Sequence, residues 1–209
     1  EAWIDQIPAL LMSWYPGVEG GRALADVLFG EVNPSAKVPV TFPKRVEDCS
    51  WYGFYPGRSG KTHYSEGIYV GYRHFDKKDI APRFAFGHGL SYTSFRYTNL
   101  RVETGTFPNA KVSMDIENTG ALAGQEVVQV YVRDAESMVD KPYKELRRFQ
   151  KVMLKPGETK TVEFELSDDA FAYYDAKLQK WEVEQGAYEI LVGASSRDIR
   201  LKQTIGLKW

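Results

Sequence analysis

Alternation of apolar and polar residues in the second half of the chain most constrains the fold. From Phe95 onward, short alternating segments are separated by turn signals such as Asn118-Thr119-Gly120 and Pro156-Gly157. Successive side chains of a strand point to opposite faces, so this pattern predicts strands with one buried face. The residues expected to face inward are Val112, Met114, Ile116, Val128, Val130, Val132, Val162, Phe164, Leu166, Tyr188, Ile190 and Val192.

About seven such strands in about 100 residues predict an all-β sandwich of the immunoglobulin-like or fibronectin type III kind over residues 95–209. Tyr188 follows a turn at Gly186 and precedes an apolar strand. This position fits the tyrosine corner of such folds, whose hydroxyl bonds back to the backbone upstream. An ordinary core tyrosine is the alternative.

Residues 1–43 have a different pattern, which indicates a fragment of an α/β layer. The apolar run Ala9 to Tyr15 predicts a strand buried on both faces, and Arg22 to Phe29 predicts a helix that stops at Gly30. One apolar stripe of this helix is expected to consist of Leu24, Val27 and Leu28. One strand and one helix cannot close a core, so other chain segments must cover them. Left exposed, the strand would favour aggregation, which points to a complex.

Residues 44–94 are rich in glycine and aromatic residues, and they predict long loops with short strands. The best strand candidate is Ile68 to Phe75. Loops of this length are usually functional or contact another body. A linker packed down by its own aromatic residues is the alternative reading.

Bulk properties exclude several classes of protein. The formal net charge of -1 and the absence of a basic run argue against nucleic-acid binding. We find no apolar stretch long enough to cross a bilayer and no signal peptide, so no membrane partner is expected. The single Cys49 rules out an internal disulfide framework, and three scattered histidines offer no metal cluster, so we expect neither a metal nor a cofactor.

Six motifs together resemble one enzyme family. They are WYPGVEGGRALADVLFGEVNPSAKVPVTFP, SEGIYVGYRHFD, FAFGHGLSYTSF, NTGALAGQEVVQVYV, KPYKELRRFQKVMLKPGETKTVEFEL and GAYEILVGASS. In this order they resemble the C-terminal part of glycoside hydrolase family 3, most closely its β-glucosidases. The resemblance covers essentially the whole chain. It implies that the sequence starts inside the family's second domain, an α/β sandwich, and continues into its fibronectin type III-like domain.

The resemblance also implies a function and a partner. The complete enzyme is expected to release terminal non-reducing β-D-glucosyl residues with retention, acting on a β-glucoside or an oligosaccharide. Such enzymes use two carboxyl groups, a nucleophile and an acid/base. In this family the nucleophilic aspartate lies in a TIM-like barrel and the acid/base glutamate precedes the WYPG segment. Both are expected upstream of Glu1, so no catalytic residue is assigned here, and the partner is the barrel domain or chain.

The loop from Trp51 to Tyr64, which is rich in aromatic residues, is the candidate substrate contact. Aromatic residues make up 14% of the sequence, and sugar C–H groups suit aromatic faces. In the family, loops outside the barrel can shape the outer rim of the substrate site. We therefore expect Trp51, Tyr52, Tyr55 and Tyr64 to contribute to that rim. Aromatic packing between domains is an equally open interpretation.

Four further polar residues lie in motif-like loops. Glu19 is expected to bond amides of the glycine turn or to meet the helix N-terminus, and Glu66 is expected to anchor a loop. His63 and His88 are expected to be turn or packing residues, because no serine or cysteine nucleophile pattern accompanies them. The glycine turn lacks the spacing of a phosphate-binding loop, so its glycines are expected to allow close packing.

Other readings stay open at the level of sequence. The sandwich is alternatively a carbohydrate-binding or protein-interaction module without catalysis, with Phe171, Tyr173 and Tyr174 as its candidate surface. β-Xylosidase and N-acetylglucosaminidase activities also occur in the family. The chain is alternatively one part of a nicked enzyme, or a homo-oligomer. Family resemblance suggests a secreted or periplasmic location.

Overall fold

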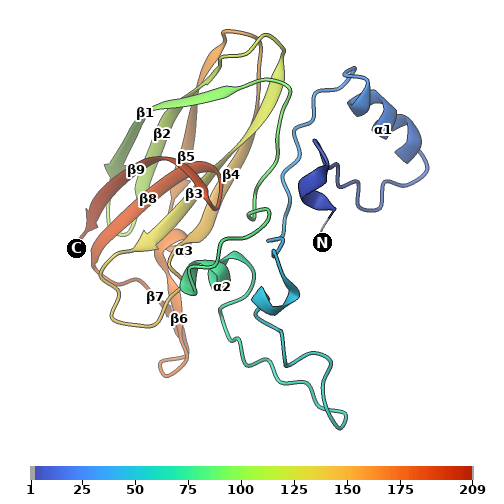
Figure 1. Ribbon diagram of the computed structural model, residues 1–209. Coiled ribbons are helices and arrows are strands. Elements are labelled where there is room, and N and C mark those ends of the chain that lie inside the picture. The colour runs from blue at the N-terminus through green and yellow to red at the C-terminus, as the bar shows by residue number, and fades with distance from the viewer. Residues whose placement is uncertain (1–2, 209) are drawn as a thin grey trace.

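Two antiparallel sheets form the central part of the fold. A computed structural model describes residues 3–208 (Figure 1). The smaller sheet has the order β1-β2-β5, and the larger has the order β4-β3-β8-β9. Their strands are β1 (Phe95–Thr104), β2 (Ala110–Asn118), β3 (Gly124–Asp134), β4 (Glu145–Leu154), β5 (Thr159–Leu166), β8 (Gly186–Ser195) and β9 (Asp198–Leu207). The predicted β-sandwich is therefore confirmed.

The core lies between the two sheets, where the alternation predicted it. Every residue expected to face inward is buried. In the smaller sheet Val112 pairs with Phe164, and in the larger sheet Val130 pairs with Val192. Because side chains alternate along each strand, these pairings place the apolar faces of both sheets toward each other.

Tyr188 has the geometry expected of a tyrosine corner. Its ring is buried at the start of β8, in an edge-on contact with Phe171 at 5.2 Å. Its hydroxyl donates to the carbonyl oxygen of Glu184, four residues upstream, at 2.9 Å. Burial, reinforced by the nearby carboxylates of Asp134 and Glu184, raises the pKa of the Tyr188 hydroxyl well above its usual value. The hydroxyl therefore stays protonated, and its hydrogen bond joins β8 to the segment before it.

The predicted N-terminal helix is present as α1 (Gly20–Leu28), after a short 3-10 turn, η1 (Ile4–Gln6). It ends where predicted, because Gly30 adopts a φ of 84°, a conformation that favours glycine. The glycine turn before α1 is tightly packed, since a Cβ at Gly20 would lie 2.6 Å from the side chain of Pro16. This supports the steric interpretation of the glycine turn.

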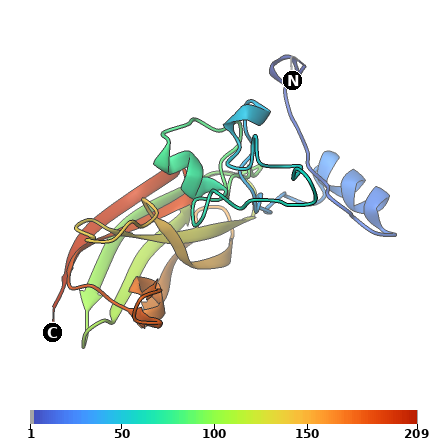
Figure 2. The same ribbon diagram turned by 90° about the horizontal axis from the view of Figure 1, so that it is seen from below.

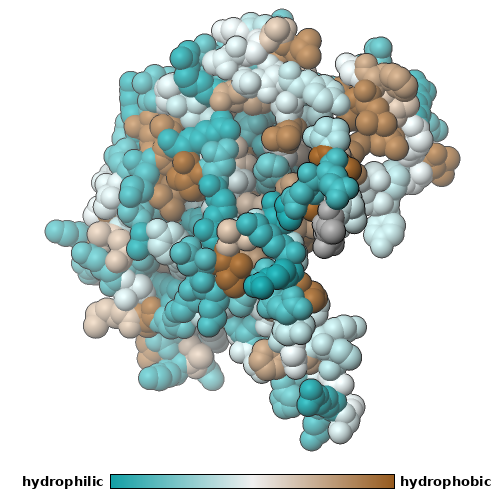
Figure 3. Space-filling view, in the orientation of Figure 1, coloured by the Kyte–Doolittle hydropathy of each residue, from teal (hydrophilic) through white to brown (hydrophobic). Residues whose placement is uncertain are grey.

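The predicted strand from Ala9 to Tyr15 is wrong. This segment has no regular secondary structure, and Tyr15 is 98% exposed. A strand needs hydrogen-bonding neighbours, and the described residues supply none here. Apolar side chains are also exposed along α1, including Leu24 and Leu28 (Figure 3). In two orthogonal views, α1 lies apart from the sandwich, on the opposite side of the molecule from the C-terminus (Figures 1 and 2).

Residues 33–42 leave α1 and run along the sandwich beside residues 83–88. The backbone of Val38 donates to His88 and accepts from Gly87, and that of Phe42 donates to Phe84, each at 2.8 Å. Lys37 reaches into the sandwich, where its ammonium lies 3.1 Å from the carboxylate of Glu126. This pair is nearly buried and links the extended segment to β3, so removing either partner would leave a buried charge uncompensated.

The predicted strand from Ile68 to Phe75 is also wrong, because its second half is the helix α2 (Tyr72–Lys77). Gly71 precedes the helix with φ 54° and ψ −135°, a conformation that ends any extended run. The helix lies against the outer face of the larger sheet, where Phe75 is buried and Tyr72 meets the ring of Tyr131 edge-on. A second short turn, η2 (Val46–Asp48), precedes the aromatic loop.

A small hairpin completes the structure. Strands β6 (Tyr173–Asp175) and β7 (Lys180–Glu182) pair after the short helix α3 (Asp168–Phe171). The hairpin projects from the end of the sandwich that also carries the β3–β4 loop (Figure 1). Within residues 3–208, no helix is long and apolar enough to span a bilayer.

Candidate functional site

The aromatic loop, residues 49–70, projects away from the sandwich between η2 and α2 (Figure 1). Turns rather than strands shape it: the amides of Phe54 and Tyr55 both donate to the carbonyl oxygen of Trp51, and Lys61 donates to Arg58. Each predicted contact residue is exposed, in contrast to the buried rings of the sandwich core. The loop therefore presents aromatic surface outward.

Two of the four predicted residues form one cluster. Trp51 and Tyr55 meet edge to face, with ring centroids 6.2 Å apart at an interplanar angle of 82°. Tyr52 lies in the same turn, and a β-bridge joins its backbone to that of Tyr55. Tyr64 lies further along the loop, beyond the turn at Arg58 to Lys61, and it is 83% exposed. Trp51 and Tyr55 thus make one aromatic pair, Tyr52 adjoins it through the backbone, and Tyr64 lies in a later turn of the loop.

Polar contacts fix both ends of the loop. At its start, the backbone amide of Arg45 donates to the side-chain carboxylate of Asp48. The backbone carbonyl oxygen of Asp48 lies 3.1 Å from Nε2 of His74. Because a carbonyl only accepts, this geometry places a proton on Nε2. At its end, the hydroxyl of Tyr69 donates to the carboxylate of Asp140 at 2.5 Å. Helix α2 thus holds the start of the loop and the β3–β4 connection holds its end, while the aromatic residues between them are exposed.

Glu19 and Glu66 are the two carboxylates that lie in loops of the recognised motifs. Glu19 occupies the position before α1, as one reading predicted, but its side chain makes no capping hydrogen bond. Glu66 accepts a backbone hydrogen bond from Tyr69 through its carbonyl oxygen, at 3.1 Å.

The two candidate histidines differ in environment. His88 stacks on Phe84 with ring centroids 5.7 Å apart, and burial lowers the pKa of its imidazole. It packs as predicted. His63 lies on the exposed face of the aromatic loop. Among residues 3–208, no three His, Cys, Asp or Glu side chains converge in a way that would hold a metal ion.

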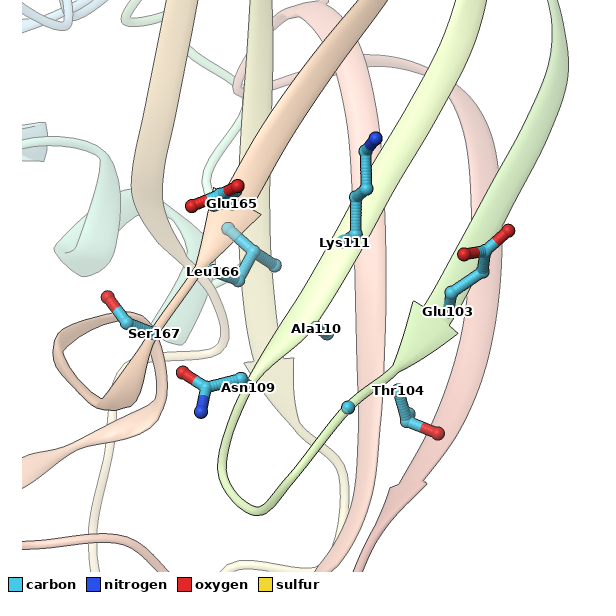
Figure 4. Close-up of a pocket in the computed structure, with 9 residues that line it drawn as sticks. Glu103, Thr104, Asn109, Ala110, Lys111, Glu165, Leu166 and Ser167 are labelled. Atoms are coloured by element: carbon cyan, nitrogen blue, oxygen red, sulfur yellow. The ribbon is translucent and has the colours of Figure 1, made fainter.

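A depression in the surface lies away from the aromatic loop. It has a volume of about 360 Å³ and lies at the turn between β1 and β2, beside the end of β5 (Figure 4). Its side chains include Glu103, Asn109, Lys111 and Glu165. It is open and polar, without the aromatic face expected for a sugar site. We assign it no binding role.

The three aromatic residues proposed for a binding face on the sandwich are separated by the fold. Phe171 is in the core, and the ring of Tyr173 is covered by the ammonium of Lys141 at 4.4 Å. Only Tyr174 is widely exposed, at 53%, and it meets Trp181 of β7, which is 67% exposed. Sequence reasoning missed Trp181, although an isolated tryptophan in a short strand after a turn was a usable signal.

Comparisons with known proteins define the class first. A family model described as the fibronectin type III-like domain matches residues 126–196, within the sandwich. A second, described as the glycosyl hydrolase family 3 C-terminal domain, matches residues 1–72. The chain thus combines an α/β piece of a glycosidase with a fibronectin type III-like sandwich.

The chain belongs to glycoside hydrolase family 3. It is 48% identical over 97% of its length to thermostable β-glucosidase B of Acetivibrio thermocellus, and 41% identical over 99% to β-glucosidase B of Emericella nidulans. Of these two relatives it covers 27% and 26%. The chain therefore spans about a quarter of the length of the curated relatives it matches.

Solved structures agree with this assignment. Over 100% of this chain and 29% of the other, the fold matches β-glucosidase 3B of Thermotoga neapolitana in complex with α-D-glucose, with a TM-score of 0.93 and 42% identity. The β-glucosidase of Kluyveromyces marxianus in complex with glucose matches with a TM-score of 0.94 and 40% identity, over 100% of this chain and 25% of the other. The resemblance read from six motifs is thus confirmed for family and fold.

Proposed function

We propose that this chain forms the C-terminal part of an exo-acting, retaining β-glucosidase that hydrolyses terminal non-reducing β-D-glucosyl residues. The observation that carries this is the match to β-glucosidases at 41–48% identity over 97–99% of the chain. The names of these relatives favour glucosides over xylosides and N-acetylglucosaminides. The segment itself is structural, and the catalytic carboxylates belong to the part of the enzyme that precedes it.

A direct comparison of activity tests this assignment. We expect the isolated chain to leave an aryl β-glucoside intact, because retaining hydrolysis needs two carboxyl groups about 5–5.5 Å apart. The full-length protein should release glucose with retention, which NMR detection of the first-formed anomer reports. Robust hydrolysis by the isolated chain would place the chemistry here and overturn the proposal.

The partner we propose is the rest of the α/β domain, with the barrel domain beyond it. In support, the exposed apolar side chains of the N-terminal piece are gathered around α1 (Figure 3). They include Leu10, Leu11, Met12, Trp14, Leu24, Leu28 and Phe29. A contiguous surface of this kind marks an interaction site. For domain limits we propose residues 1–43, 44–94 and 95–209 as the α/β piece, the connecting region and the sandwich.

Within that enzyme, we assign the aromatic loop to the outer rim of the substrate site. Trp51, Tyr52, Tyr55 and Tyr64 are exposed, and their loop is fixed at both ends. In the full-length enzyme, Trp51→Ala or Tyr55→Ala should raise KM for an oligosaccharide several-fold. KM for a small aryl glucoside should stay the same. If both variants changed only stability, packing between domains would be the role of these rings.

A second candidate function rests on the exposed pair Tyr174 and Trp181. Their rings meet at 5.6 Å on the β6–β7 hairpin, where the face of a ring suits a sugar. This favours a surface carbohydrate contact by the sandwich. Pull-down on an insoluble β-glucan, comparing the full-length protein with its Trp181→Ala variant, tests it. Equal retention of the two proteins would eliminate it.

A further inference from the structure

The helix α2 is held on the sandwich by one buried carboxylate. Asp76 binds the ammonium of Lys144 with one oxygen and Nε of Arg197, at 3.1 Å, with the other. The side chains of Asp76 and Lys144 are only 4% and 5% exposed. Arg197 also donates to the carbonyl oxygens of Phe75 and Ile80, at 3.0 and 3.1 Å. The two cations come from the β3–β4 and β8–β9 connections, so a single residue joins α2 to two parts of the larger sheet.

Other contacts define the orientation of α2. The ring of Tyr72 stacks on Phe86 with centroids 4.9 Å apart, and its hydroxyl accepts from the amide of Leu146 at 2.9 Å. Arg73 pairs with Glu145 at 2.7 Å. Each of these partners lies in β4 or in the segment before β1. These contacts hold α2 in one orientation on the sandwich, so the face of the helix that points away from the sheet has a fixed direction.

Two side chains of α2 support the aromatic loop. His74 contacts the carbonyl oxygen of Asp48 at the start of the loop. Lys77 donates to the hydroxyl of Tyr69 at 3.2 Å and to the carboxylate of Asp140 at 2.8 Å at its end. Because residues three apart lie on one helix face, a single helical turn contacts both ends of the loop.

We propose that Asp76, through Lys144 and Arg197, is a positioning residue that sets where the aromatic loop lies relative to the sandwich. Through these contacts the sandwich acts on the outer rim of the substrate site without supplying the rim residues. This effect on substrate rests on the rim function proposed above. Loss of the Asp76 charge leaves the buried ammonium of Lys144, and the partly exposed guanidinium of Arg197, without their shared partner. This displaces α2 and frees both ends of the loop.

Hydrogen exchange and kinetics on the full-length enzyme test this. In Asp76→Asn we expect amides of residues 49–70 to exchange at least fivefold faster, and trypsin to cut after Arg58 or Lys61 at least fivefold faster. KM for an oligosaccharide should rise about as much as in Tyr55→Ala, and kcat on a small aryl glucoside should stay the same. In the Tyr55→Ala background, Asp76→Asn should add little to KM.

Matched variants separate positioning from general stability. Lys111→Met removes the cation of an exposed pair with Glu163 and should leave loop exchange unchanged. Lys144→Met should accelerate exchange in the loop, and Lys144→Arg, which keeps the charge, should restore it. If Asp76→Asn does not fold, Asp140→Asn provides a milder test, because it removes only the support at the end of the loop.

The outcomes are distinct. Loop exchange in Asp76→Asn and in Asp140→Asn equal to that of the parent enzyme would overturn the positioning role. Faster loop exchange with unchanged KM for the oligosaccharide would confirm positioning and overturn the rim function. Faster exchange throughout the sandwich, with no excess in residues 49–70, would show that the buried carboxylate serves stability alone and would also overturn the inference.

Discussion

The sandwich and the N-terminal piece both contain apolar segments, but these are buried in the sandwich and exposed in the N-terminal piece. In the sandwich, Val130 and Ile190 are fully buried between paired strands. In the N-terminal piece, the apolar run from Ala9 to Tyr15 is exposed and has no regular structure. An alternating strand needs one apolar partner face, which the chain supplies itself. A run that is apolar on every side needs partners on both faces, and the described residues provide neither.

The largest effect that would sharpen this comparison comes from two matched leucines. Leu154 is fully buried in the core, whereas Leu28 of α1 is 63% exposed. Leu154→Ala should lower the free energy of unfolding by about 4 kcal/mol, because it removes packed atoms and leaves a cavity. Leu28→Ala should change it by less than about 0.5 kcal/mol. Urea unfolding of the chain measures both, and equal losses would contradict the comparison.

The second effect concerns Lys37, which belongs to the first third of the sequence but packs on the sandwich. Lys37→Met leaves the nearly buried carboxylate of Glu126 without its cation, although the hydroxyl of Tyr97 still donates to it at 2.9 Å. We expect a loss of about 3 kcal/mol in the free energy of unfolding. The exposed Lys111 is the control, where Lys111→Met should cost less than about 0.5 kcal/mol. A loss at Lys37 no larger than at Lys111 would show that residues 33–42 are not part of the sandwich unit.

A smaller effect is expected at the tyrosine corner. Tyr188→Phe keeps the buried ring but removes the hydroxyl that donates to Glu184. The carbonyl oxygen then loses its partner, at a cost of about 1 kcal/mol. The midpoint of thermal unfolding should fall by a few degrees, as calorimetry would record. An unchanged midpoint would mean that water replaces the lost donor.

The smallest effect is a gradual loss of sandwich stability in acid. Hydrogen bonds from Arg148 and Ser167 hold the pKa of Asp169 well below its usual range, and those from Asn99 and Thr161 lower the pKa of Asp115. A depressed folded-state pKa adds stability above the unfolded value near about 4, and this is lost as pH falls. Urea midpoints should therefore decline below about pH 4, with a shallower decline in Asp169→Asn. A flat profile from about pH 5 to 3 would disprove this.

Much of the sandwich follows from sequence because its signals are local. Strands β2, β3, β5 and β8 repeat a period of two, and their turns carry Gly or Pro, so each segment specifies its own conformation and buried face. Helix α2 was missed because the run Ile68 to Phe75 is rich in strand-forming residues, and the backbone conformation of Gly71 divides it. The strand predicted from Ala9 to Tyr15 was wrong for a different reason. A continuous apolar run forms a strand only where neighbouring segments pair with it and cover it, and the described residues supply no such neighbours.

The candidate site was predictable only in part. Aromatic density in a glycine-rich segment identified the loop from Trp51 to Tyr64, and the structure shows its rings to be exposed. Its supports were not predictable, because they join residues far apart in sequence. Tyr69 meets Asp140 across 71 positions, and Asp76 meets Lys144 across 68. No local pattern distinguishes such charged residues from solvent-exposed ones.

The pairing of residues 33–42 with residues 83–88 bears on where the chain can accept added residues. The stretch between Phe42 and Arg83 includes α2, which packs on the sandwich, and its two ends meet, because the amide of Arg83 donates to the carbonyl oxygen of Phe42 at 2.8 Å. The stretch between them is thus an excursion that begins and ends at one place. Lengthening a closed excursion is entropically inexpensive, at about 0.6 kcal/mol for each doubling. We therefore expect added residues in the exposed part of this stretch, between η2 and α2, to cost little stability and to leave the sandwich unchanged.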